Sequence, residues 1–158
     1  MKYKNKVLRY FITGIALILS VQSAFSQTKM ETAAIETTAV KEVRKALNGQ
    51  VQAWNEGKLE QAMTFYWESS EMLWISKAGI DKGYTPVLEM FRKDFSDRSK
   101  MGVYTYTPLF IEEISPEAVY FVFRWKIELN GKQLMGGVSS QLWKKLDGAW
   151  VITAEHAS

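Results

Sequence analysis

Residues 119–129 read VYFVFRWKIEL, and every second residue from Val119 to Leu129 is large and apolar. Arg124, Lys126 and Glu128 occupy the alternate positions. This period of two predicts a β-strand with one face against a core and the other against solvent. The pair Asn130-Gly131 follows directly and is typical of a tight type I′ hairpin turn.

Further strands are predicted on both sides of this hairpin. Residues 102–114 form one strand, in which Pro108 indicates a bulge or an edge position. Residues 132–145 pair back after the turn, and Gly136-Gly137 within them predicts a bulge that bends the sheet. Asp147-Gly148 makes a second type I′ turn before a last strand at residues 149–156.

The N-terminal half follows a helical period instead. Val43, Leu47, Val51 and Trp54 lie four, four and three residues apart, which predicts a helix that ends at Gly57. A shorter helix at residues 59–66, a strand at 72–76 and a loop at 79–83 are expected next. A third helix is then predicted, with Thr85 as N-cap and Pro86 at its first position. Helices followed by a strand meander favour an α+β domain.

The first residues have the layout of a secretory signal peptide. Four basic residues precede an uncharged apolar run at residues 11–21, and Ala24 and Ser26 are the small residues before a cut at Gln27. We therefore expect a signal peptide at 1–26, a flexible leader at 27–38 and one domain at 39–158. The mature protein is expected to be periplasmic or secreted and to have no membrane anchor after cleavage.

Charge and composition exclude several classes of function. The chain has 158 residues, 20 Lys and Arg, 17 Asp and Glu, and no Cys. Cleavage after Ser26 removes four basic and no acidic residues, which leaves a net charge of about −1 and no signal for nucleic-acid binding. One His without any Cys falls short of a zinc or iron site, so no metal or other cofactor is expected.

Two motifs carry a family resemblance: Trp54-Asn55-Glu56-Gly57 after the first helix, and WVITAEHAS at residues 150–158. The chain resembles the nuclear transport factor 2-like superfamily, and within it the secreted SnoaL-like proteins of unknown function. These are similar to the association domain of calcium/calmodulin-dependent kinase. The resemblance implies a cone-shaped, cystatin-like fold with three N-terminal helices packed on a curved antiparallel sheet. It also implies a pocket at the open end and a homodimer formed through the other sheet face, where Tyr120 and Val122 lie.

His156 and Glu155 are the candidate catalytic residues. His156 is the only histidine, and its ordinary pKa near 6.5 suits a general base. Adjacent residues of a strand point to opposite faces, so only one of the two enters a pocket unless a bulge intervenes. His156 lies an even number of residues from Trp150 and Ile152, which favours His156 as the residue that faces the pocket. The alternative places Glu155 in the pocket together with Thr153.

Aromatic side chains are the strongest chemical feature of the sequence, and they predict an apolar pocket with a few polar groups. The expected ligand-binding residues are Trp74, Tyr84, Phe121, Phe123, Trp125, Gln141 and His156. The predicted function is the binding of a small apolar molecule by a homodimer. Two alternatives stay open: a cofactor-independent isomerase, dehydratase or cyclase that uses His156 or Glu155 as general base, and an oligomerisation module.

Overall fold

A computed structural model describes residues 36–158 of the chain. The elements in this part of the chain are α1 (Thr38–Asn55), α2 (Leu59–Met63), β1 (Leu73–Ser76), β2 (Gly79–Lys82), α3 (Tyr84–Asp94), α4 (Arg98–Met101), β3 (Val103–Ser115), β4 (Ala118–Leu129), β5 (Lys132–Leu146) and β6 (Ala149–Ala157). The expected α+β class is confirmed. The predicted signal peptide and most of the leader lie outside the described residues, and Thr38 of the leader is the first residue of α1.

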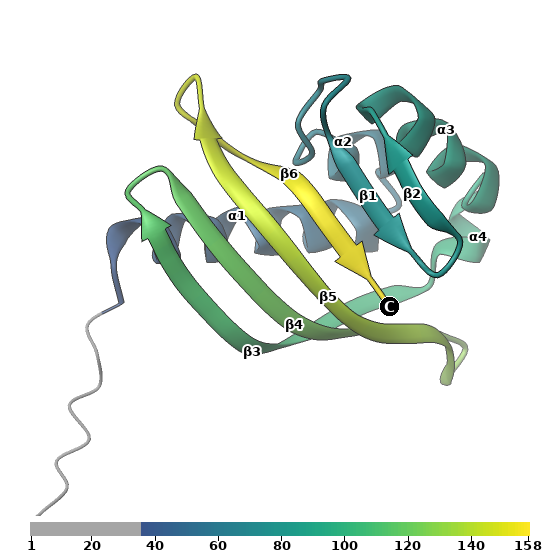
Figure 1. Ribbon diagram of the computed structural model, residues 1–158. Helices are drawn as coiled ribbons and strands as arrows, with labels where there is room; N and C mark the ends of the chain where they lie inside the picture. Colours follow the sequence, from purple (N-terminus) through teal and green to yellow (C-terminus); the bar gives the residue numbers. More distant parts are fainter. Residues whose placement is uncertain (1–35) are drawn as a thin grey trace, which may run out of the picture. The chain divides into compact units, whose positions relative to one another are not determined.

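The six strands form one curved sheet in the order β2-β1-β6-β5-β4-β3 (Figure 1). All neighbouring strands are antiparallel except β1 and β6, which run parallel. The last strand is therefore a central one, because the β1–β2 hairpin extends the sheet beyond it. No helix within residues 36–158 is long and apolar enough to cross a membrane.

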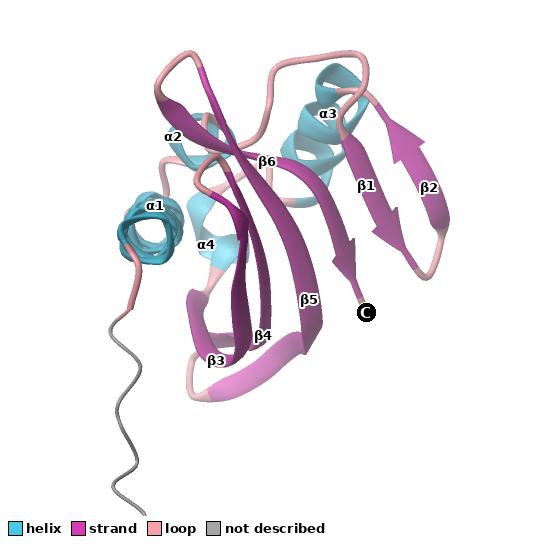
Figure 2. Ribbon diagram, turned by 60° about the vertical axis from the view of Figure 1, so that its left-hand side comes forward, coloured by secondary structure: helices cyan, strands magenta, loops and turns pink. Residues whose placement is uncertain are grey.

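The main core lies between α1 and the inner face of β4, β5 and β6. Figure 2 shows α1 end-on beside β3 and β4, against which it packs. Val43 and Leu47 of α1 are fully buried, as are Phe121, Phe123 and Trp143 of the sheet. The apolar face of the helix, which has a period of 3.6 residues, and the apolar face of the strands, which has a period of two, therefore pack together in one core.

Several predicted boundaries are confirmed by the backbone. Thr37 caps α1 by accepting a hydrogen bond from the Val40 amide at 3.3 Å. Gly57 follows this helix with a φ of +72°, as expected for its end. Both hairpin turns have positive φ at their two central residues, namely Asn130-Gly131 and Asp147-Gly148, as type I′ turns require.

Two predictions about residues 79–86 are wrong, and a fourth helix forms that the sequence analysis does not predict. Residues 79–82 form strand β2 rather than a loop, because they pair with β1 from Ser76↔Gly79 to Leu73↔Lys82. The N-cap of α3 is Gly83 instead of Thr85, since the Gly83 amide is anchored on the Met72 carbonyl and the helix begins at Tyr84. A fourth helix, α4, forms a single turn capped by the side chain of Asp97.

The role predicted for Gly136-Gly137 also needs correction. The register shift between β4 and β5 lies at Leu134, which has no partner between the pairs Glu128↔Gln133 and Ile127↔Met135. Gly137 instead allows a close approach, because any side chain at this position would collide with the Ser158 carbonyl oxygen. Ser158 exchanges two backbone hydrogen bonds with Val138 at this point.

Candidate functional site

A cavity of about 360 Å³ lies between the helices and the inner face of the sheet. Its lining comes from α1, α2, α3 with its C-cap Phe95, and every strand except β2, together with the segments that flank β1. Seven of the lining residues are aromatic: Trp54, Tyr66, Trp74, Phe91, Phe95, Tyr104 and Trp125. This volume is at the lower end of the range for ligand pockets, roughly 300–1,000 Å³, and suits a molecule of one or two rings.

The aromatic side chains of the cavity wall contact one another edge to face. The ring centroids of Trp74 and Phe91 lie 5.1 Å apart, and those of Trp54 and Phe95 lie 4.7 Å apart. Such T-shaped pairs add stability beyond the apolar area that they bury. The wall is therefore built from side chains that hold one another in place.

The motif Trp54-Asn55 fixes two elements of this wall. The Trp54 indole donates a hydrogen bond to the Met101 carbonyl at 3.1 Å, which joins α1 to α4. The Asn55 side chain pairs with the backbone of Tyr104, donating to its carbonyl at 2.9 Å and accepting from its amide at 2.7 Å. The end of α1 thereby positions both the Trp54 and the Tyr104 rings.

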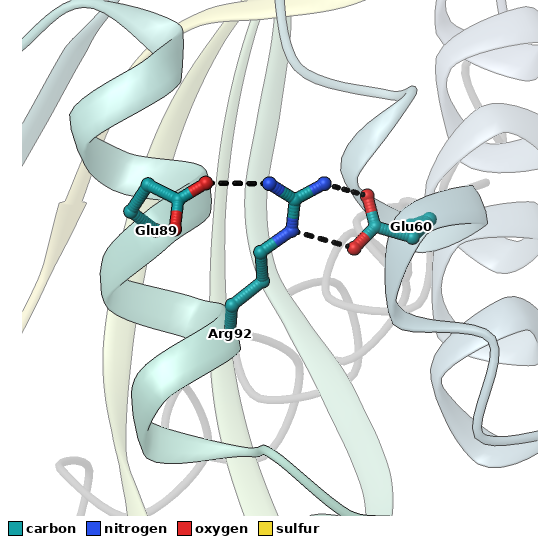
Figure 3. Close-up of polar contacts among 3 residues, drawn as sticks. All are labelled: Glu60, Glu89 and Arg92. Atoms are coloured by element: carbon teal, nitrogen blue, oxygen red, sulfur yellow. Dashed lines mark hydrogen bonds and ion pairs between the residues drawn. The ribbon is translucent and has the colours of Figure 1, made fainter.

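A charged contact on the surface holds the two helices that border the cavity. Arg92 of α3 donates two hydrogen bonds of 2.8 Å to the carboxylate of Glu60 on α2, and it also contacts Glu89 one turn earlier (Figure 3). The side chains are exposed, so each ion pair contributes little on its own. The bidentate geometry nevertheless fixes the spacing of α2 and α3.

Glu155 is the buried carboxyl of the cavity wall. It lies on β6 and is 4% exposed. Its Oε2 accepts a hydrogen bond of 2.7 Å from the Tyr66 hydroxyl and one of 2.8 Å from the Gln141 amide. Gln141 in turn accepts from the Trp143 indole at 2.8 Å. Both of these hydrogen bonds end on Oε2, so neither Tyr66 nor Gln141 occupies Oε1.

The environment of Glu155 favours its neutral form. Burial raises the pKa of the carboxyl above its ordinary value of 4.5, although hydrogen bonds from Tyr66, Gln141 and Ser139 act in the opposite direction. Burial and the nearby Glu155 charge also raise the pKa of the Tyr66 and Tyr104 hydroxyls well above 10. Both tyrosines are therefore neutral throughout the physiological pH range.

A bulge in β6 decides that Glu155 faces the cavity. Trp143 pairs with Ile152 and Leu142 pairs with Ala154, so Thr153 is an extra residue in β6. Beyond it the alternation is reversed, and Glu155 pairs with the buried Gln141. The expectation that His156 faces the helices is therefore wrong, because parity with Ile152 does not survive the bulge.

His156 instead is exposed and pairs with Ser140 on the outer face of the sheet. Of the other expected ligand-binding residues, Trp74 and Trp125 line the cavity. Phe121 and Phe123 are fully buried in the core beside α1, and Gln141 reaches the site through Glu155. Tyr84 is half-buried, packs on the core and does not line the cavity.

Tyr66 is a site residue that the sequence analysis does not predict, because it falls in the helix expected at residues 59–66. It lies beyond α2, where the segment around it pairs with Ile152 through hydrogen bonds of 2.8 and 3.0 Å. This pairing brings its hydroxyl to Glu155. A buried tyrosine usually needs a hydrogen-bond partner, which is the only signal that could have pointed to a polar role.

Two further observations concern polar groups within the described residues. The Nε1 of Trp125, in the cavity wall, is the one buried side-chain nitrogen or oxygen there that has no hydrogen-bond partner. No group of three or more His, Asp or Glu side chains in residues 36–158 is placed to hold a metal ion. Glu155 is thus the buried ionisable group of the lining, and Trp125 Nε1 is a second polar group that faces it without a partner.

Solved structures of other proteins share this architecture. A domain of unknown function from Nostoc punctiforme with a cystatin-like fold is 19% identical, covers 77% of this chain and 78% of its own, and superposes with a TM-score of 0.61. A nuclear transport factor 2-like protein from Salmonella enterica is 20% identical over 77% of this chain and 90% of its own, with a TM-score of 0.56. These likenesses establish a cystatin-like fold.

A third structure is similar in sequence as well. It is a nuclear transport factor 2-like protein of unknown function from Shewanella oneidensis, with 30% identity over 75% of this chain and 97% of its own and a TM-score of 0.71. The chain belongs to the nuclear transport factor 2-like proteins, as its motifs indicate. The sequence matches no protein-family model and no curated protein.

Proposed function

We propose that the protein binds a small, largely apolar molecule in the aromatic cavity, with Glu155 as the polar contact. The observation that carries this proposal is a buried carboxyl in the wall of a cavity lined mainly by aromatic and aliphatic side chains. An apolar enclosure with a few fixed polar groups is the usual form of a small-molecule site. A purely structural oligomerisation module has no need of such an enclosure.

The proposal is tested by closing the cavity. Ala78 lines the cavity and is exposed, so Ala78→Trp places a ring at its mouth with little disturbance of the core. Ala149 is also exposed but lies outside the lining, which makes Ala149→Trp a matched control. The probe is 2-(indol-3-yl)ethanol, a neutral two-ring molecule, measured by calorimetry. We expect Ala78→Trp to abolish binding and Ala149→Trp to preserve it. No binding to the unaltered protein would contradict the proposal for ligands of this size.

An enzyme is the second candidate, and one observation favours it. A carboxyl whose pKa is raised by burial is suited to take a proton from a carbon beside a carbonyl group and to return it elsewhere, as an isomerase does. The carboxylate would remove the proton, and the resulting carboxylic acid would deliver it. Exchange of solvent deuterium into an enolisable two-ring ketone, lost in Glu155→Gln, is the expected result for an enzyme; exchange equal to the buffer rate excludes it for that ketone.

We also propose that the protein forms a homodimer through the outer face of the sheet. Phe110 and Tyr120 lie there on neighbouring strands, with ring centroids 6.4 Å apart and exposed fractions of 50% and 36%. Exposed aromatic pairs on a sheet face are typical of interaction surfaces.

The cellular location is a separate proposal, based on the sequence of residues 1–26. We propose cleavage before Gln27 and export to the periplasm or the medium. Mass spectrometry of the protein from its native host would give a chain that begins at Gln27. An intact chain that retains Met1 would contradict the proposal.

A further inference from the structure

The charges around the cavity are all of one sign. Glu155 is its buried acidic residue, and Asp94 of α3 is exposed at its rim. None of the described residues that line the cavity is Lys, Arg or His. An anionic ligand, such as a carboxylate or a phosphate, would find no positively charged side chain in this lining.

Aromatic faces favour a positive charge. Three indole rings lie in the wall, those of Trp54, Trp74 and Trp125, and indole is the ring that attracts cations most strongly. Trp74 lies next to the carboxyl, since it pairs with Glu155 between β1 and β6. A desolvated cation near these rings gains more than one in water does.

The carboxyl itself lacks a positive partner. Tyr66 and Gln141, which are neutral donors, bind Oε2 of Glu155, and no ion pair to Glu155 is present within residues 36–158. A buried carboxylate without a compensating charge is unfavourable, and an ammonium group would supply that charge together with a hydrogen bond.

We infer that the natural ligand of this cavity is an organic cation: an amine with an apolar body of one or two rings, whose ammonium group binds Oε1 of Glu155. The inference rests on the proposed binding function and specifies its ligand class. The rings of the wall enclose the apolar body, and the carboxylate selects the positively charged group. A neutral carbonyl compound, bound by a protonated Glu155, is the alternative that the experiment separates.

Three molecules that share an indole ring and differ in charge test the inference: tryptamine, 2-(indol-3-yl)ethanol and indole-3-acetate. Calorimetry at neutral pH should give at least about ten-fold tighter binding for tryptamine than for the alcohol, and the weakest binding for the acetate. Glu155→Gln keeps the size of the side chain and an oxygen for Tyr66 and Gln141. This variant should weaken the binding of tryptamine by about ten-fold and change the affinity for 2-(indol-3-yl)ethanol by less than about two-fold.

A second variant keeps the test decisive if Glu155→Gln misfolds. Ala78→Lys adds a positive charge to the cavity lining, and Ala149→Lys adds the same charge outside it. Only Ala78→Lys should weaken the binding of tryptamine, and it should have no comparable effect on the affinity for 2-(indol-3-yl)ethanol.

The outcomes distinguish the two proposals. Equal or tighter binding of the alcohol would overturn the cation inference and leave the binding function intact. Tightest binding of the acetate would overturn the charge argument as a whole. Failure of all three molecules to bind would overturn the binding function for ligands of this size, and the inference with it.

Discussion

The Tyr66 hydroxyl donates a hydrogen bond of 2.7 Å to Oε2 of Glu155, although 89 residues separate the two in the sequence. Each member of the pair lies on a segment that Ile152 helps to place: Tyr66 forms a bridge with Ile152, and Glu155 follows it beyond the bulge. The polar centre of the cavity therefore depends on how these segments pair.

Tyr66→Phe should destabilise the protein, because it leaves a buried carboxyl with one donor fewer. We expect a loss of about 1–3 kcal/mol in the free energy of unfolding, measured by urea denaturation at neutral pH. The pKa of Glu155 should rise further, since a hydrogen bond that lowers it is removed. Tyr106→Phe is the control, because the Tyr106 hydroxyl bonds to Asn48 at 2.7 Å in an exposed setting. Equal losses in both variants would contradict the role given to Tyr66.

Glu155→Gln should remove a specific pH dependence of stability. The pKa of Glu155 is raised in the folded protein above the ordinary 4.5 of the unfolded chain. The carboxyl therefore contributes stability that is fully present below about pH 4.5 and is lost as the pH rises through the folded-state pKa. Each unit of difference in pKa corresponds to about 1.4 kcal/mol.

Thermal unfolding of both proteins between about pH 4 and pH 8 measures this effect. The stability of Glu155→Gln relative to the unaltered protein should increase with pH and then level off above the folded-state pKa. The other carboxyls are common to both proteins, so the difference isolates Glu155. A constant difference across the range would show that the carboxyl has the same pKa in both states.

Tryptamine affinity should depend on pH in the opposite sense. Its ammonium group needs the ionised carboxylate, so affinity should fall as the pH is lowered through the pKa of Glu155. The Tyr66 and Tyr104 hydroxyls near Glu155 stay neutral, and Asp94 lies exposed at the rim. 2-(Indol-3-yl)ethanol provides the uncharged control, and calorimetry at several pH values measures both. A pH-independent tryptamine affinity would rule out contact with Glu155.

His156→Ala should have almost no effect on the cavity. The imidazole is exposed on the outer face of the sheet, so the free energy of unfolding should change by less than about 0.5 kcal/mol. Tryptamine affinity should also be unchanged. Glu155→Ala is the comparison: it leaves the Tyr66 and Gln141 donors without their acceptor, at a cost of about 1–3 kcal/mol. Loss of binding in His156→Ala would place the imidazole in the cavity after all.

Val122→Lys tests the proposed dimer. Val122 lies between Phe110 of β3 and Ser140 of β5 on the outer face, and a charge there is unfavourable in an apolar interface. Light scattering should give the mass of a dimer for the unaltered protein and of a monomer for the variant. Gln61→Lys, at an exposed position of α2, should keep the dimer. An unchanged mass in Val122→Lys would exclude this face as the interface.

The sequence predicts much of the fold, because the pattern of each long element is strong. Residues 119–129 alternate so regularly that strand, inner face and following turn are all correct. The short elements are harder to predict. Gly79 and Gly83 make residues 79–82 look like a turn, and only their pairing with β1 makes them a strand. Local pattern cannot reveal a partner strand.

Prediction of the site was limited by a different cause. The sequence predicts Trp74 and Trp125 as lining residues, because aromatic residues on the inner face of a sheet converge where the sheet curves over helices. The prediction that His156 and not Glu155 faces the cavity is wrong, because nothing in the sequence of residues 149–156 indicates the extra residue at Thr153. That bulge forms where β6 leaves the segment around Tyr66 and meets β1, which is a property of the whole sheet.

The bulge also affects how relatives of this protein should be compared. Thr153 is buried, and its hydroxyl donates to the Leu142 carbonyl at 3.2 Å across the irregular pair. A relative with the same Glu-His dipeptide but a regular strand would present an imidazole, and not a carboxyl, to its ligand. A sequence alignment would show those two proteins as identical at the Glu-His dipeptide. Divergence of ligand chemistry in such a lineage can therefore arise from a change in backbone pairing, with every residue of the dipeptide retained.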